Sequence, residues 1–204
     1  MEVLFATTNP AKIKSYKEKL EEHGIKVLTL KDLGLNIDVK ETGRSAIENA
    51  CIKAETYGKL AKKITIGIDT NLFFENVPEN KQPGTHVRRV NGKTLTDEEM
   101  IEYYKNLANE FGGKLTAKWV NGVAIYNGEE TKTYSFAKSK FYLVNTESEK
   151  RHPGYPLDSI SIIPEFNKYL TDLTEEEMET RAKWQNENNK ESAVDAICKI
   201  LKNM

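Results

Sequence analysis

The sequence predicts an α/β fold in which one mixed β-sheet is flanked by helices. Over residues 3–68, short apolar runs alternate with amphipathic segments of helical period. The pattern changes to alternating β segments between residues 114 and 144, and helical segments return after residue 174. Strands and helices that alternate and then give way to a β meander are typical of a sheet with helices on its flanks.

The first two strands and the helix between them are predicted by local signals. Residues 3–7, Val-Leu-Phe-Ala-Thr, form an apolar run that indicates a buried strand. Asn9-Pro10 then supplies a helix cap followed by a proline at the first helical position, so we expect a helix to about Glu22. Residues 27–30 predict a second strand.

A second helix is expected to begin at Ser45, because Ser45 and Glu48 have the spacing of a capping box. The continuous apolar run at residues 64–68 predicts a strand that is buried on both faces. Asp69 follows this run directly, so we expect its carboxylate at the carboxyl end of a buried strand.

The second half of the chain is predicted to be mostly β between helical segments. Residues 95–109 have the period of a helix, and residues 114–144 have alternating β segments. Asn-Gly pairs at 121–122 and 127–128 each suit a tight hairpin turn, so a strand is expected to end before each pair. Two final helices are expected at about residues 174–188 and 192–202.

The charge balance restricts the kind of partner. The chain of 204 residues carries 30 Lys and Arg residues against 31 Asp and Glu residues, which gives a formal charge of −1 at pH 7. Proteins that bind nucleic acid polymers generally need an excess of positive charge, so the composition argues against that class. A small anionic ligand stays open, because a few local cations suffice for it.

The cysteines, histidines and N-terminus exclude other classes. Cys51 and Cys198 are far apart in the chain, so we expect buried thiols in a reducing compartment and no disulfide framework. The three histidines lack paired ligand spacing, which argues against a zinc site. The N-terminal apolar run is too short for a signal peptide or a membrane span, so the expected location is the cytoplasm, without membrane contact.

The segment Thr7-Thr8-Asn9-Pro10-Ala11-Lys12 lies between the first expected strand and helix. Helix N-termini present N–H groups and a partial positive charge, and Lys12 would add a full charge. This turn is therefore a candidate phosphate cradle. The alternative is an ordinary capped helix with a solvated lysine.

Two acidic residues are candidates for metal binding. Glu41 lies in a loop, where its carboxylate either binds a metal or faces water, and Asp69 is either a strand-end cap or a metal ligand and general base. Hydrolysis of a phosphoanhydride needs a divalent cation, a carboxylate to hold it and a water to be deprotonated, and these two residues could meet that need. Nearby, Asn49 and Lys53 are four residues apart and so share a helix face.

Two loops could also contact a ligand. Arg88 and Arg89 follow the Pro83-Gly84 turn and could bind phosphate or carboxylate in bidentate fashion, or form an ordinary surface pair. Tyr155 lies in a loop rich in Pro and Gly and could stack on a base, although an aromatic side chain in such a loop more often fills a core.

Taken in order, these segments resemble the inosine triphosphate pyrophosphatase family, whose members hydrolyse non-canonical purine nucleoside triphosphates. The family opens with Thr/Ser-x-Asn-x-x-Lys, matched by Thr7, Asn9 and Lys12, and continues with Glu-x-Gly, matched by residues 41–43. Its specific Glu-Asn-Ala-x-x-Lys-Ala motif is matched by residues 48–54. The Asp-Asp-Ser-Gly-Leu strand end is weakly matched by residues 68–72, and Pro-Gly-x-x-x-x-Arg by residues 83–89.

The resemblance implies an elongated, two-lobed α/β fold, here a single domain over residues 1–204, and a homodimer. It also implies a Mg²⁺-dependent attack of water on the α-phosphorus, which yields a nucleoside monophosphate and pyrophosphate. Glu41 and Asp69 would hold Mg²⁺, Asp69 would activate the water, and Lys12 would complete the catalytic set. The substrate-binding residues implied by the resemblance are Thr7, Thr8, Asn9, Lys12, Asn49, Lys53, Thr70, Arg89, Gly154, Tyr155 and Asp158.

The chain departs from the family pattern mainly where the family recognises the base. Ile68 stands in place of the first Asp of Asp-Asp, and the Phe-Gly-Tyr-Asp loop reads Pro153-Gly154-Tyr155-Pro156, with Asp158 two residues on. The family's late lysine falls at or near Met178, and its Ser-His-Arg reads Ala182-Lys183-Trp184. Because a site loses discrimination when its hydrogen-bond donors are lost, we hypothesise a nucleotide pyrophosphatase with altered base preference.

Two alternatives belong to other classes. One is a nucleotide-binding protein that has lost catalysis, because Ile68 removes an acid beside the presumed base. Thermal stabilisation by nucleotide without turnover would favour it. The other is a hydrolase of a different phosphorylated metabolite on the same scaffold, similar to the septum-associated pyrophosphatases, although those proteins open with a turn rich in Ser and Arg.

Overall fold

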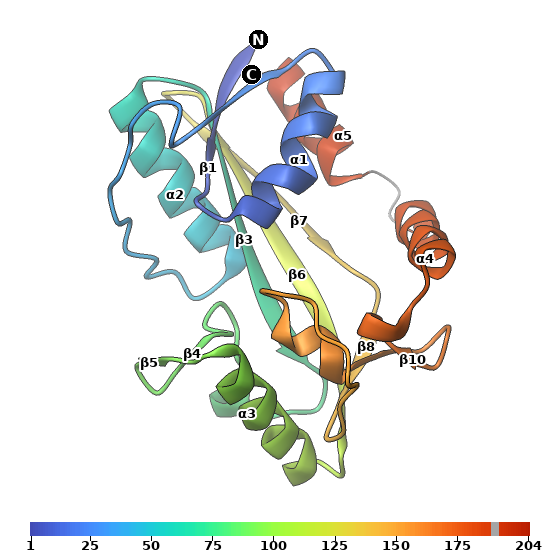
Figure 1. The fold of residues 1–204 in the computed structure, drawn as a ribbon. Helices are drawn as coiled ribbons and strands as arrows, with labels where there is room; N and C mark the ends of the chain where they lie inside the picture. Colours follow the sequence, from blue (N-terminus) through green and yellow to red (C-terminus); the bar gives the residue numbers. More distant parts are fainter. Residues whose placement is uncertain (189–191) are drawn as a thin grey trace. The chain divides into compact units, whose positions relative to one another are not determined.

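The computed structural model describes residues 1–188 and 192–204 (Figure 1). The α-helices are α1 (Pro10–Glu22), α2 (Ala46–Ala61), α3 (Asp97–Glu110), α4 (Glu175–Asn188) and α5 (Ala193–Lys202). Each begins within about two residues of its predicted start. The strands are β1 (Glu2–Ala6), β2 (Lys26–Thr29), β3 (Thr65–Phe74), β4 (Arg89–Val90), β5 (Lys93–Thr94), β6 (Lys114–Tyr126), β7 (Thr131–Ala137), β8 (Phe141–Val144), β9 (Ser161–Ile163) and β10 (Lys168–Tyr169). Short 3₁₀ helices are η1 (Glu79–Lys81), η2 (Pro156–Ile160) and η3 (Leu170–Asp172).

Within the described residues, the strands form a mixed eight-stranded sheet in the order β10-β9-β8-β6-β3-β1-β2, with β7 paired to β6. β1 is parallel to both β2 and β3, whereas β8 is antiparallel to β6 and β9. Strands β4 and β5 form a separate hairpin. The predicted mixed sheet flanked by helices is confirmed.

The chain divides into two compact units. Unit 1 comprises Met1–Thr70, Val120–Phe136 and Glu191–Met204, and unit 2 comprises Asn71–Trp119 and Ala137–Lys190. The long strands β3 and β6 contribute residues to both units.

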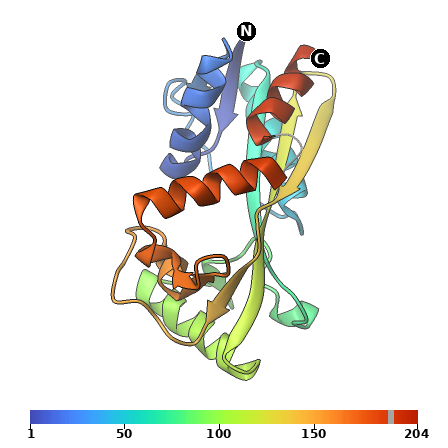
Figure 2. The ribbon, with the colours of Figure 1, turned by 90° about the vertical axis from the view of Figure 1, so that its right-hand side faces the viewer.

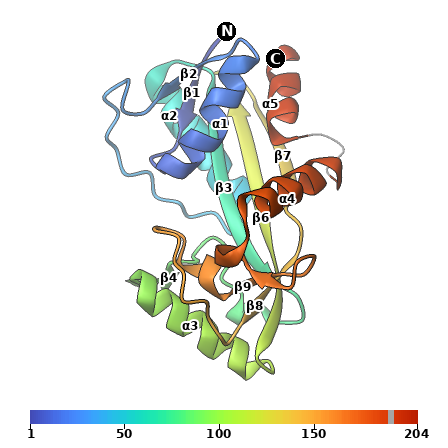
Figure 3. The same ribbon diagram turned by 45° about the vertical axis from the view of Figure 1, so that its right-hand side comes forward.

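In unit 1, helices cover both faces of the strands (Figures 1 and 3). On the face of α1 and α5, Phe5 and Ile68 belong to a buried cluster that includes Ile197 of α5. On the face of α2, Leu4 packs with Tyr57 in a second cluster. Because successive side chains of a strand point to opposite faces, β1 and β3 contribute to both cores.

Helix α2 packs very close to β3. A Cβ atom on Gly67 would lie 2.2 Å from the carbonyl oxygen of Ala50, so only glycine fits at this point of the strand. The helix begins where the capping signal predicts, since the Ser45 hydroxyl accepts a hydrogen bond from the Glu48 N–H at 3.2 Å. The Glu48 carboxylate accepts from the Arg44 N–H at 2.6 Å. This close approach places the side chains of α2 against the middle of β3.

The predicted hairpin turn at Asn121-Gly122 is wrong, because β6 continues through both residues to Tyr126. A Cβ atom on Gly122 would lie 2.4 Å from the backbone nitrogen of Ile47. Glycine is therefore needed here for the close approach of the N-terminus of α2, and not for a turn. Asn121 is buried, and its side-chain oxygen accepts a hydrogen bond from the Thr70 hydroxyl at 2.9 Å.

The second predicted turn, at Asn127-Gly128, is confirmed. Gly128 has a φ of 107°, and the Asn127 side-chain oxygen accepts hydrogen bonds from the N–H groups of Glu129 and Glu130, each at 2.9 Å. The turn joins β6 to β7, which run side by side in unit 1 (Figure 2).

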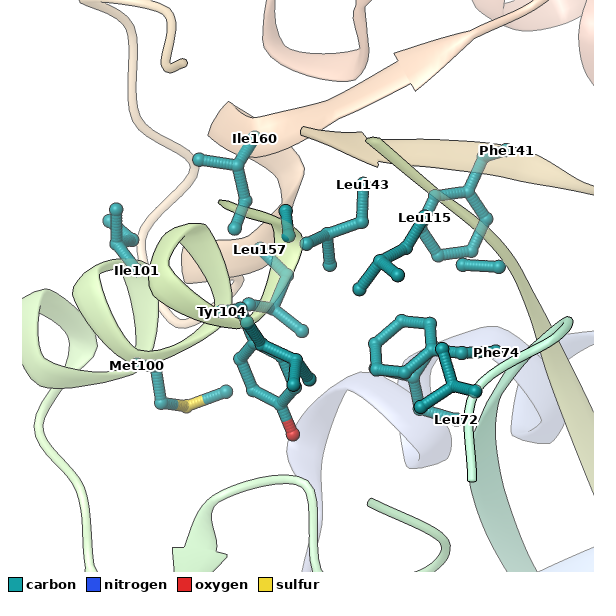
Figure 4. Packing of buried hydrophobic residues seen from close by; sticks show 14 of the residues in the cluster. Leu72, Phe74, Met100, Ile101, Tyr104, Leu115, Phe141, Leu143, Leu157 and Ile160 are labelled. Carbon is teal, nitrogen blue, oxygen red and sulfur yellow. The ribbon is translucent and has the colours of Figure 1, made fainter. Parts of the chain in front are cut away.

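The core of unit 2 is an apolar cluster between α3 and the strands (Figure 4). Phe74 of β3 meets Tyr104 of α3 edge-on, with ring centroids 6.0 Å apart. The buried Tyr104 hydroxyl donates to the carbonyl oxygen of Val87 at 2.9 Å. Thr96 and Glu99 form a capping box at the start of α3.

Helix α4 is attached to unit 2 along one of its faces. Lys168 donates to Glu177 at 2.6 Å, and Trp184 stacks on Phe166 with ring centroids 5.6 Å apart. Residues 177, 181 and 184 share a helix face, so Arg181 lies on the same face as both contacts. Over residues 1–188 and 192–204, no helix is both long and apolar enough to span a membrane.

Candidate functional site

A cavity of about 250 Å³ lies in unit 1, beside the carboxyl end of β1 and the start of α1. Parallel strands commonly place ligands at this end. Among the lining residues are seven predicted site residues, namely Thr7, Thr8, Asn9, Lys12, Glu41, Lys53 and Asp69. The remaining wall consists of Ala6, Leu30, Ile37, Asp38, Val39 and Tyr57.

The turn before α1 is organised by its own side chains. Thr7 Oγ1 accepts from the Asn9 N–H at 3.1 Å, and Asn9 Oδ1 accepts from the Lys12 N–H at 3.3 Å, so Asn9 caps the helix as predicted. Pro10 is the first helical residue. The N-terminal turn of α1 therefore lines the cavity, and its dipole favours an anion there.

Asp69 lies inside β3, because this strand continues to Phe74 and does not end at residue 68 as predicted. Its side chain is on the face of α2, and the residue is only 8% exposed. Asp69 Oδ2 accepts from Asn49 Nδ2 at 3.0 Å, and Oδ1 accepts from Lys53 Nζ at 3.1 Å. The predicted pairing of Asn49 and Lys53 on one helix face thus serves to hold the carboxylate.

Glu41 is linked to Asp69 because both carboxylates form an ion pair with Lys53. Its Oε2 lies 3.3 Å from Lys53 Nζ, and its side chain is partly exposed. Asn49 fixes the loop that carries Glu41, since Asn49 Oδ1 accepts from the Gly43 N–H at 2.8 Å. Both ends of the Asn49 amide are therefore engaged, and the residue is fully buried. Its predicted contact with substrate stays a prediction.

Lys12 is the second cation of the cavity. Its Nζ donates to the carbonyl oxygen of Ile68 at 3.4 Å and lies 3.7 Å from Asp69 Oδ1. Burial, followed by the nearby charge of Lys53, lowers the pKa of Lys12, while Asp69 and Glu41 oppose that shift. An incoming anion would raise the pKa of Lys12 again, because it adds negative charge beside the ammonium.

The carboxylates suit a magnesium ion. Over residues 1–188 and 192–204, no group of three or more His, Cys, Asp or Glu side chains could hold a metal. Glu41 and Asp69 nevertheless share one cationic partner, so a single small cation can lie between them. Mg²⁺ is usually held by one or two carboxylates together with water and substrate phosphates, and this donor set fits that pattern.

The neighbours of Asp69 on β3 have other roles. Ile68 is 1% exposed and points into the apolar cluster on the opposite face, so an acid at this position would not lie beside Asp69. Thr70 is half-buried, and its hydroxyl donates to Asn121. Thr70 does not line the cavity, and its predicted contact with substrate stays a prediction.

The remaining predicted residues belong to unit 2. Arg89 lies in β4 of the small hairpin, whereas the guanidinium of Arg88 is paired with Asp97 at 2.7 Å. Gly154 has a φ of 80° in an exposed loop, and Tyr155 is half exposed there. Their predicted contacts with substrate also stay predictions.

Asp158 is the centre of a polar cluster in unit 2 that the sequence did not indicate. His152 Nδ1 lies 2.9 Å from Asp158 Oδ2, and burial raises the pKa of Asp158 despite this contact. Burial also lowers the pKa of Lys138 and of Arg181, and both cations act on Asp158. The family resemblance had already named Asp158, but Lys138 and Arg181 come from segments distant from its loop. Only the periodicity that places Arg181 on the attached face of α4 could have pointed to one of these two cations.

Tyr57 is a further residue without a sequence signal for the site. Its hydroxyl donates to the carbonyl oxygen of Ile37 at 2.8 Å and so fixes one wall of the cavity. In the sequence, Tyr57 belongs to an apolar helical stripe, which predicts only burial.

The sequence model of the Ham1 family matches residues 3–190. The dITP/XTP pyrophosphatase of Bacillus subtilis (strain 168) is 32% identical over 181 residues, which cover 86% of this chain and 87% of the relative. The dITP/XTP pyrophosphatase of Leptospira interrogans is 28% identical over 202 residues, which cover 98% of this chain and 97% of the relative.

Solved structures share the fold. A HAM1 protein from Coxiella burnetii matches with a TM-score of 0.77 and 21% identity over 100% of both chains. The Ham1 protein of Staphylococcus aureus matches with a TM-score of 0.68 and 24% identity, over 92% of this chain and 100% of the other. The resemblance inferred from the sequence motifs is confirmed by these matches.

Proposed function

Because the chain belongs to the Ham1 family, we propose that it is a nucleoside triphosphate pyrophosphatase that converts non-canonical purine nucleoside triphosphates to monophosphates and pyrophosphate. The observation that carries the proposal is the cavity of unit 1, where two lysines and two carboxylates meet the N-terminus of α1. A phosphate chain and a divalent cation need this combination of charges.

The cations and the helix end would bind the phosphate chain. The turn Thr7-Thr8-Asn9 offers hydroxyl, amide and backbone donors, and Lys12 adds a full charge. Lys53 supplies a second ammonium from α2. Because Thr7 and Asn9 are already fixed by hydrogen bonds within the turn, little reorganisation of the turn is needed when phosphate arrives.

Glu41 and Asp69 would hold Mg²⁺, which when bound neutralises phosphate oxygens and acidifies water. Asp69 would also take a proton from the attacking water, since Asn49 holds its carboxylate in a fixed orientation. The proton would go to an Asp69 oxygen as the water oxygen bonds to the α-phosphorus and pyrophosphate leaves. A positioned general base contributes about 10²–10⁴-fold to such a step.

The base is proposed to be recognised through unit 2, with Gly154, Tyr155 and Asp158 in the loop suggested by the family resemblance. Because the family's donors are absent at Met178 and at residues 182–184, we propose that base preference differs from that of the relatives. Family resemblance also supports a homodimer in the cytoplasm, and sedimentation of the purified protein would test the dimer.

Hydrolysis assays on a panel of triphosphates test the proposal. Purified protein with Mg²⁺ is expected to release pyrophosphate and monophosphate from dITP, ITP or XTP. The altered base preference predicts a narrower margin over ATP and GTP than a site that keeps the base-reading donors. Lys59→Met is the matched surface control, because the exposed Lys59 ammonium contacts Glu55 and the Tyr126 ring and does not line the cavity. This variant should retain full activity.

The outcomes separate the alternatives. Absence of pyrophosphate from every triphosphate, combined with thermal stabilisation by nucleotide, would indicate a binding protein that has lost catalysis. Release of phosphate from a different metabolite alone would indicate another hydrolase on this scaffold.

A further inference from the structure

One ammonium group joins the two carboxylates to which Mg²⁺ binding is assigned. Lys53 Nζ lies 3.1 Å from Asp69 Oδ1 and 3.3 Å from Glu41 Oε2. Lys53 is only 8% exposed, and its position four residues after Asn49 on α2 fixes the direction of its side chain. In the ligand-free protein, a monovalent cation therefore lies in the space between both carboxylates.

The burial of Asp69 explains why a cation is needed there. A buried carboxylate is costly unless it is paired and hydrogen-bonded. Lys12 Nζ is 3.7 Å from Asp69 Oδ1, too far for a good hydrogen bond, so Lys53 is the nearer cation. Without a ligand, Lys53 contributes the shorter of the two ionic contacts to Asp69.

The charge balance of the site restricts what can be added to it. The two lysines and three carboxylates that line the cavity (Asp38, Glu41 and Asp69) give a formal sum of −1, so a divalent cation alone would leave one positive charge uncompensated. The metal would also have to compete with Lys53 for the same oxygens. A triphosphate brings several negative charges, and these offer Lys53 a new partner.

We infer that Lys53 is a resident cation that blocks the metal position until substrate phosphates draw its ammonium away from Glu41 and Asp69. This inference rests on the proposed function, because it assumes that a divalent cation binds these two carboxylates. Metal and triphosphate binding then strengthen each other, since each favours the displaced position of Lys53. Lys53 thus balances the charge of the buried Asp69 carboxylate in the free protein. The metal then binds tightly only when substrate is present.

Mn²⁺ titration of the nucleotide-free protein tests this inference, with free Mn²⁺ followed by electron paramagnetic resonance. Lys53→Met should bind Mn²⁺ about tenfold more tightly than the wild type, because the competing charged hydrogen bonds are removed. Lys59→Met, on the same helix but paired with Glu55, should bind like the wild type. Equal or weaker binding by a folded Lys53→Met variant would overturn the inference.

Two further variants control for misfolding and for metal binding elsewhere in the protein. Lys53→Gln keeps a hydrogen-bond donor without the charge, and it replaces Lys53→Met if the latter does not fold. Adding Glu41→Gln to either variant should abolish the gain in Mn²⁺ affinity, and a gain that survives would contradict the assignment of the metal to this pair. The measurement needs no turnover, so tighter binding with no triphosphate hydrolysis would count against the proposed function alone.

Discussion

The two faces of β3 in unit 1 differ sharply although their residues alternate along one strand. On the face of α1 and α5, Ile66 and Ile68 pack in an apolar cluster. On the face of α2, Asp69 is also buried, but it lines the cavity and has hydrogen bonds from Asn49 and Lys53. The apolar face stabilises the fold by excluding water. The other face stabilises a buried carboxylate by giving each of its oxygens a hydrogen bond. A buried carboxylate is thus tolerated when its neighbours donate hydrogen bonds to it and balance its charge.

The largest expected effect is a loss of kcat that occurs on substitution at one face of β3 and not at the other. Asp69→Asn should lower kcat by about 10²–10⁴-fold, because a neutral amide cannot accept the proton of water. Ile68→Val on the opposite face should cost only about 0.5–1.5 kcal/mol of stability and leave kcat nearly unchanged. Steady-state kinetics with dITP, together with thermal melts, would check both variants. Full activity in Asp69→Asn would remove this residue from the catalytic set.

Ile68→Asp tests whether an acid can be restored at the position where the family has one. We expect destabilisation by about 3–5 kcal/mol and no gain in activity, because the new carboxylate would be buried among apolar side chains without a partner. Denaturant unfolding measures the cost. A stable and more active variant would show that this position faces the site after all.

Gly67→Ala tests the close approach of α2 to the strand. The added Cβ would lie 2.2 Å from the Ala50 carbonyl oxygen, so we expect a loss of about 1–3 kcal/mol. Because the same helix carries Asn49 and Lys53, kcat should fall as well. Denaturant unfolding and kinetics on one preparation would show whether the two losses occur together, and a variant with wild-type stability would contradict the packing.

The smallest expected effect concerns pH. Burial lowers the pKa of Lys12, so this side chain loses its charge at a lower pH than an ordinary lysine. The KM for the triphosphate should therefore rise as the solution becomes alkaline, before ordinary lysines titrate. Lys12→Arg should move that rise to higher pH, because a guanidinium stays charged. An identical pH profile for both proteins would exclude Lys12 as its cause.

Local signals and the family motifs predicted most helices and seven of the residues that line the cavity. Ser45 caps its helix as expected, and the periodicity of α2 correctly placed Asn49 and Lys53 on one face. The sequence could not show that Asn121-Gly122 lies inside a strand, because the reason is the N-terminus of α2 packed against Gly122. The end of β3 was misplaced for a similar reason, since pairing within the sheet extends the strand beyond its apolar run.

The polar cluster of unit 2 also depends on tertiary packing that the sequence does not show. His152 and Asp158 are near each other in the sequence, but Lys138 and Arg181 come from distant segments and meet only through tertiary packing. The family's Ser-His-Arg motif is aligned with residues 182–184, where its residues are missing. Arg181 directly precedes these positions, so the motif comparison does not include it.

Hydrolysis of dITP in ¹⁸O-labelled water tests most directly whether the cavity of unit 1 directs water to the α-phosphorus. We predict that one labelled oxygen appears in the nucleoside monophosphate and none in pyrophosphate, with Asp69→Asn blocking the incorporation. Label in pyrophosphate, or release of inorganic phosphate in place of pyrophosphate, would contradict attack at the α-phosphorus.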